Sequence, residues 1–160
     1  MLTGCGFEPL YASKPDSDVA AALSSISVDA PEDREAQLVT NALFLGLNTT
    51  GAKGEARYSL RLKSVSSVSN LAIERDSRVT RANYRQTVSY ALSDIKTGRI
   101  VLKGNSTRAA SYNKVASEFA NDQAELNARE RTSKAIAEDI RMQIALKLKQ
   151  GGLEPDEDGK

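Results

Sequence analysis

Cys5 is the only cysteine in the chain and the first residue that could carry chemistry. A single thiol cannot form an internal disulfide, and the extreme end of a chain is a poor place for a catalytic group. The sequence contains no histidine, which excludes Ser-His-Asp and Cys-His sites and removes the most common metal ligand. No serine lies in a motif that would pair it with a lysine as a nucleophile. We therefore expect no catalytic activity and no cofactor.

Four cations form a second group of candidates. Arg75, Arg78 and Arg81 follow one another at intervals of three residues, and Lys114 lies further along the chain. Guanidinium groups bind phosphate through forked, charge-assisted hydrogen bonds. The alternative is a solvated loop in which the arginines pair with neighbouring acidic residues.

The overall composition is typical of one globular domain. The chain has 160 residues, of which 40% are hydrophobic and 27% charged. Its 22 basic and 21 acidic residues give a net charge of +1, so no global charge attracts nucleic acid. No apolar run approaches the roughly 18 to 20 residues that span a bilayer. Any electrostatic partner must therefore be recognised by a local group of charges.

The first third of the chain predicts a tether, a short strand and a helix. Residues 1–24 are polar, rich in Ala and Ser, and contain two prolines, which favours an extended tether. Ile26 and Val28 alternate with polar residues and predict a strand. Pro31, followed by two acidic residues, predicts the first turn of a helix that ends near Leu47.

The middle of the chain predicts β-strands. Apolar and polar residues alternate over 57–68 and again from residue 82, as in strands with one apolar face. Residues 93–99 predict a turn in which Gly98 adopts positive φ. The segment 82–112 is therefore a long antiparallel hairpin, and we expect the tyrosines of both strands to be core or face residues.

The last third predicts a long helix from about Ser117 to Gln150, because it lacks proline and glycine. Two glycines end it, and residues 151–160 are expected to form a disordered acidic tail. The pattern does not explain Glu130, which falls near the apolar stripe. The residues expected to face the sheet are Leu126, Ser133, Ala137, Ile140, Ile144 and Leu148, with Ile136 beside them.

This order predicts an α+β two-layer sandwich over residues 25–150, in which two helices pack on one face of an approximately four-stranded, mainly antiparallel sheet. The strand that ends near residue 68 and the strand that begins near residue 82 meet at one end of the sheet. The strand that ends at Tyr112 must reach the same end. The loop 69–81 and Lys114 should therefore meet there, so that four cations converge.

Leu2-Thr3-Gly4-Cys5 resembles the lipobox of bacterial lipoproteins, in which an aliphatic residue and two small residues precede the cysteine. That resemblance implies cleavage before Cys5 and attachment of lipid to its thiol. We expect Met1 to stand in place of most of a signal peptide. An ordinary free cysteine is the alternative.

Three segments are similar to the lipopolysaccharide-assembly lipoproteins of the LptE family, especially the alphaproteobacterial ones. They are Cys5-Gly-Phe-Glu-Pro-Leu-Tyr11, Ser89-Tyr-Ala-Leu-Ser-Asp94, and Ser111-Tyr-Asn113 with Ser117-Glu-Phe-Ala120. The family pattern of a lipobox, four strands and two helices agrees with the order of elements expected above.

The resemblance implies a non-catalytic outer-membrane lipoprotein that faces the periplasm and is anchored in the inner leaflet by its lipid. It would plug the LptD β-barrel and assist the transport of lipopolysaccharide to the outer leaflet. Arg75, Arg78, Arg81 and Lys114 would then contact lipid A phosphates. The alternative is a generic periplasmic lipoprotein that binds another envelope protein or a glycan.

Overall fold

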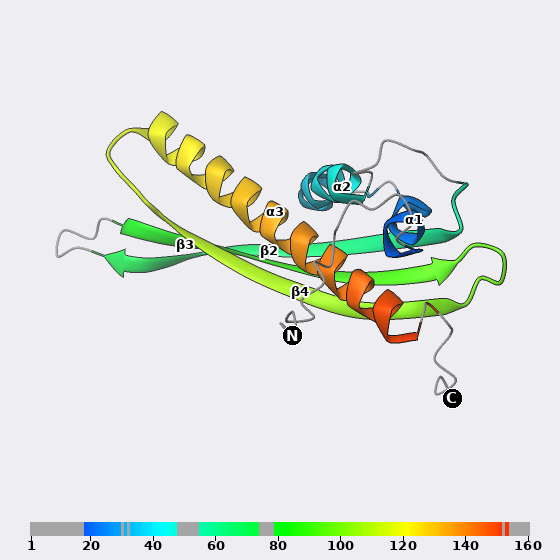
Figure 1. Cartoon of the computed structure of the whole chain (residues 1–160). Helices are drawn as coiled ribbons and strands as arrows, with labels where there is room; N and C mark the ends of the chain where they lie inside the picture. The colour runs from blue at the N-terminus through cyan, green and yellow to red at the C-terminus, as the bar shows by residue number, and fades with distance from the viewer. Residues whose placement is uncertain are drawn as a thin grey trace, which may run out of the picture.

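Four strands form one sheet, and three helices lie on one of its faces (Figure 1). The computed structural model describes residues 18–29, 31, 33–47, 55–73, 79–151 and 153. The predicted α+β class, with two layers, is confirmed. The elements are α1 (Asp18–Ser24), β1 (Ile26–Val28), α2 (Arg34–Leu47), β2 (Tyr58–Ile73), β3 (Val79–Asp94), β4 (Ile100–Asn113) and α3 (Glu118–Gly151).

The sheet has the order β1-β2-β3-β4 and is mainly antiparallel, as predicted. Only β1 and β2 are parallel, with Ile26 opposite Tyr58. We call the end where β2 stops and β3 begins the tip, and the opposite end, with the β3–β4 turn, the base. Gly98 in that turn has φ of 70°, and Asp94 accepts a hydrogen bond from the Thr97 N–H at 2.9 Å. The predicted hairpin is confirmed.

Strands β2 and β3 extend further toward the tip than the sequence predicts. The apolar alternation weakens after Val68, which is why the prediction stopped there. The backbone ladder nevertheless continues, with Asn70 opposite Ala82 and an irregularity on either side of Ala72. Hydrogen bonds between strands do not require apolar side chains, so a polar pair of strands can remain paired beyond the core.

The prediction of an extended tether over residues 1–24 is wrong for residues 18–24, which form helix α1. Val19 and Leu23 are four residues apart and both pack against the main core, where Leu23 is buried. The tail predicted over residues 151–160 is corrected at Leu153, which is also buried in this core. In both segments one leucine is held by tertiary packing that local composition does not reveal.

Helices α2 and α3 each begin at a capping side chain. Asp33 accepts a hydrogen bond from the Ala36 N–H at 2.6 Å at the start of α2. Ser117 does the same for the Ala120 N–H at 3.4 Å at the start of α3. The predicted bounds of both helices are confirmed within a few residues.

The face of α3 that contacts the sheet differs from the predicted stripe in its first half. Leu126 is exposed, whereas Ala128 and Thr132 are buried. The buried positions follow a spacing of four, and four residues turn the helix about 40° beyond one full turn. The contact line therefore winds around α3 as it crosses the sheet. Glu130, which the pattern left unexplained, is exposed. The remaining residues of the buried face are Ser133, Ile136, Ala137, Ile140, Ile144 and Ala145.

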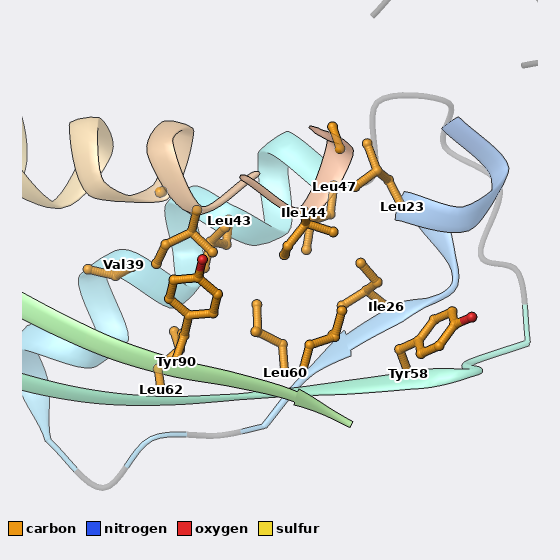
Figure 2. Packing of buried hydrophobic residues seen from close by; sticks show 14 of the residues in the cluster. Leu23, Ile26, Val39, Leu43, Leu47, Tyr58, Leu60, Leu62, Tyr90 and Ile144 are labelled. Atoms are coloured by element: carbon orange, nitrogen blue, oxygen red, sulfur yellow. The ribbon is translucent and has the colours of Figure 1, made fainter. Parts of the chain in front are cut away.

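The main core lies toward the base, between the sheet and the three helices (Figure 2). Leu60 and Leu92 from the sheet, Leu43 from α2 and Ile144 from α3 are each at most 1% exposed. A second, smaller cluster lies toward the tip and consists of Ala82, Tyr84, Tyr112 and Ala128. The first cluster is rich in branched aliphatic side chains, whereas the second combines two tyrosines with two alanines.

Candidate functional site

Of the predicted site residues, the structure describes Arg81 and Lys114. Cys5, Arg75 and Arg78 lie outside the described residues. Arg81 is exposed near the start of β3 and lies opposite Asn113 at the end of β4. Lys114 follows directly, so both residues lie at the tip end of the sheet, Arg81 on the outward face and Lys114 near Glu125 of α3.

The connection from β4 to α3 holds Lys114 in place. Asn121, in the first turn of α3, accepts a hydrogen bond from the Val115 N–H at 2.8 Å and donates one to the Val115 carbonyl at 3.0 Å. One side chain thus satisfies both backbone groups of a residue in the connection. The segment that follows β4 is therefore ordered by α3 rather than left as a free loop.

An ionic network lies behind these two cations, between α3 and the sheet. The Tyr112 hydroxyl donates a hydrogen bond to Glu125 at 2.9 Å. Arg129 donates to the same carboxylate at 2.6 Å and also pairs with Glu35 of α2. Its guanidinium lies 5.2 Å from the centre of the Tyr84 ring. The network joins α2, α3, β3 and β4.

The network changes the pKa of its members in the directions expected from their neighbours. Hydrogen bonds from Arg129 lower the pKa of Glu125, with smaller contributions from Tyr112 and Lys114. The bond to Glu125 in turn raises the pKa of Arg129. Burial raises the pKa of Tyr112 to about 12, and the adjacent carboxylate of Glu125 adds to the effect. Glu125 and Arg129 therefore remain charged, and Tyr112 remains neutral, over the physiological range.

The charges at the tip do not all serve the same purpose. Arg129 is engaged by two carboxylates, so it stabilises the fold and is not offered to a ligand. The charge of Lys114 is partly offset by Glu125. Arg81 is exposed and has no carboxylate partner among the described residues. Of the two described candidates, Arg81 is thus the more available for an external anion.

A hollow of about 630 Å³ lies between α2 and α3 next to this network. Its walls include Glu35, Glu125, Asp122 and Glu130, with Arg34 and Arg129 as the cations. The excess of carboxylates disfavours a phosphate there. Within the part of the chain that the structure describes, no three acidic, cysteine or histidine side chains are grouped as metal ligands would be. Over the same residues, no helix is both long and apolar enough to cross a membrane.

Local sequence patterns do not reveal the whole of this network. Glu125 and Arg129 are four residues apart on a helix, a spacing that favours an ion pair and could have been noticed. Glu35 is 94 residues from Arg129. No local pattern connects them, because only the packing of α2 beside α3 brings them together.

Comparisons with known proteins agree with one another. The family model "LptE: Lipopolysaccharide-assembly" matches residues 23–148. A crystal structure of a lipoprotein from Caulobacter crescentus CB15 is similar with 29% identity and a TM-score of 0.67, covering 82% of this chain and 96% of that one. No curated protein matches the sequence significantly.

Two more distant structures share the fold. The minor lipoprotein from Acinetobacter baumannii has 20% identity and a TM-score of 0.58, with 76% of this chain and 88% of that chain covered. Rare lipoprotein B from Shewanella oneidensis has 18% identity and a TM-score of 0.56, with 78% and 95% covered.

Proposed function

Since the chain belongs to the LptE family of lipopolysaccharide-assembly proteins, we propose that it is an outer-membrane lipoprotein that plugs an LptD-type β-barrel. The observation that carries the proposal is the family match, which runs from the end of α1 through all four strands and nearly all of α3. A domain that fills a barrel needs a core of its own, and the main core supplies one. The role is structural and involves no catalysis.

The anchor in this proposal is a lipid on Cys5. Two or more acyl chains hold a protein stably on a bilayer, whereas one chain binds only marginally. Mass spectrometry of the full-length precursor, made in a Gram-negative host, should show cleavage before Cys5 and an acylated N-terminus. An unmodified thiol would reject the anchor without bearing on the barrel.

Co-purification tests the plug directly. The tagged lipoprotein is extracted from outer membranes with detergent, and an LptD-type barrel should be recovered with it in equal amounts. An unrelated tagged lipoprotein from the same membranes is the control. Absence of the barrel, with the tagged protein intact, would leave the generic envelope-binding role.

The second part of the proposal concerns lipopolysaccharide. Arg81, together with Arg75, Arg78 and Lys114, would contact its phosphates at the tip, where guanidinium groups can form forked hydrogen bonds. A change at Arg81 should leave the fold intact, because this residue is exposed and belongs to neither core cluster.

A pair of charge-matched variants tests this contact. Arg78→Glu with Arg81→Glu should weaken lipopolysaccharide binding strongly and change the free energy of unfolding by no more than about 0.5 kcal/mol per site. Arg131→Glu with Lys134→Glu alters two exposed cations of α3 by the same charge. Equal losses in both variants, or none in either, would exclude a localised site at the tip.

A further inference from the structure

The two faces of the sheet differ sharply in charge. One face is covered by the helices (Figure 1). The register and burial pattern place the alternate side chains of β2, β3 and β4 on the other face. We call this second surface the basic sheet face. The side chains on this face belong to the odd-numbered residues within 59–71 of β2, 81–93 of β3 and 103–113 of β4. They include five cations and no acidic residue: Arg61, Lys63, Arg81, Arg85 and Lys103.

Three of these cations lie close together near the base. The strand register places Arg61 opposite Ala91, and Ala91 opposite Lys103, in one row across the sheet. Lys63 stands in the next outward row, opposite Ser89. Strands lie about 4.8 Å apart and outward neighbours on one strand about 7 Å apart, so the three cations fall within roughly 12 Å. All three side chains are exposed.

Two acidic side chains lie near this group, since Asp29 and Asp33 line one hollow with Arg61 and Lys63. Arg61 pairs with Asp29 at 3.6 Å, but the arginine side chain is 82% exposed and the pair is weak. Other carboxylates are engaged on the helix side of the sheet, where Asp139 pairs with Arg108 and Glu125 with Arg129. The outward positions of β2, β3 and β4 therefore carry a local excess of positive charge that the net charge of +1 does not reveal.

We propose that the basic sheet face docks on the surface of an anionic phospholipid bilayer. Its cations are spread in rows over an open face, which suits several separate headgroups better than one small anion. Exposed hydroxyl and amide side chains, such as Ser89 and Asn105, lie between the cations and can donate hydrogen bonds to phosphate and ester oxygens. The biological setting rests on the proposed function and is the lipid-anchored domain before it enters the barrel, when a tether from Cys5 would hold the basic sheet face beside a bilayer.

Each exposed Lys or Arg near an anionic membrane contributes about 1 kcal/mol, which corresponds to roughly fivefold in affinity. Removing three cations should therefore weaken binding on the order of 100-fold. The attraction is electrostatic, so added salt should reduce it for the unaltered protein.

The test uses the full chain without its lipid, so that the face is measured independently of the anchor. Binding is followed by flotation with vesicles of phosphatidylglycerol and phosphatidylcholine, and with vesicles of phosphatidylcholine alone. The protein should float only with the first. The triple variant Arg61→Gln, Lys63→Gln and Lys103→Gln should lose this binding and keep its melting temperature.

The control removes the same residue types from the exposed side of α3, as Arg131→Gln, Lys134→Gln and Lys149→Gln. It should float as the unaltered protein does. Equal weakening in both triple variants would mean a diffuse attraction and would overturn the docking face. Equal flotation with and without phosphatidylglycerol would overturn it too. So would binding to lipopolysaccharide micelles without binding to these vesicles. None of these outcomes depends on acylation of Cys5, so failure of the anchor and failure of the face are distinguishable.

Discussion

The interface between α3 and the sheet is built differently at its two ends. Toward the base, Ile140 and Ile144 are fully buried against Leu60 and Leu92. Toward the tip, the buried helix residues Ala128 and Thr132 are small, and Arg129 beside them pairs with Glu35 and Glu125. The base is held by burial of apolar area, which is not directional. The tip is held by hydrogen bonds and ion pairs, which depend on every partner being in place.

Gln86 marks the boundary between the two ends. Its side chain is fully buried and donates to Ser64 at 3.1 Å and to the carbonyl of Glu35 at 3.3 Å. Its carbonyl oxygen accepts from Ser133 at 3.1 Å and Thr132 at 3.4 Å. A buried amide is tolerated only when its groups are bonded in this way. One continuous helix can thus pass from an apolar layer to a polar one, provided that the polar groups at the junction are hydrogen-bonded.

The largest effect should come from the base. Ile144→Ala removes a fully buried side chain and leaves a cavity, so the free energy of unfolding should fall by roughly 2 to 5 kcal/mol. Met142, which is 43% exposed on the same helix, is the control, and Met142→Ala should cost no more than about 1 kcal/mol. Denaturant melts measure both. Equal losses would show that the outer side of α3 is also covered.

An intermediate effect is expected at the tip. Arg129→Met keeps the aliphatic stem but leaves Glu125 and Glu35 without their cation. We expect a loss of about 1 to 3 kcal/mol, less than for a fully buried pair, because these side chains are 25% to 30% exposed. Arg131→Met, two residues away and exposed, should be nearly neutral. A similar small change in both variants would mean that the network adds little to stability.

The same variant should alter the response to acid. Because its pKa is lowered in the fold, Glu125 contributes stability that is present above its unfolded pKa and lost as the pH falls through the folded value. Removing Arg129 removes the main cause of that shift. Unfolding of Arg129→Met should therefore depend less on pH in the acid range than unfolding of the unaltered protein.

The smallest effect concerns Tyr112. Tyr112→Phe removes one hydrogen bond to Glu125 and should cost about 1 kcal/mol at neutral pH. Because burial raises the pKa of Tyr112 from 10.0 to about 12, its contribution is complete below pH 10 and is lost as the pH rises toward 12. The stability of the variant should fall less steeply across this window, as measured by urea unfolding. Tyr84 and Tyr90, whose pKa values burial also raises, should maintain part of the slope.

Local patterns predicted the elements and the base of the interface. Alternation over 57–68 and from residue 82 identified the strands, and the spacing of Ile140 and Ile144 identified the buried side of α3. These patterns succeed because an apolar side chain that must be buried repeats with the period of its own element. They failed for Leu126, since the contact line winds around the helix, and for residues 18–24, where Leu23 joins a core built from distant segments.

Local periods and turns in the sequence predict the fold class and the placement of residues 81 and 114 at one end of the sheet, because hairpin topology follows from them. They do not predict α1 or the pairing of charges, which the tertiary structure decides. It also decided that Arg129 joins Glu35 and Glu125, and that Arg61, Lys63 and Lys103 share one face. The physical reason is that strand register and helix packing set distances between side chains far apart in the chain, and electrostatic interactions depend on those distances.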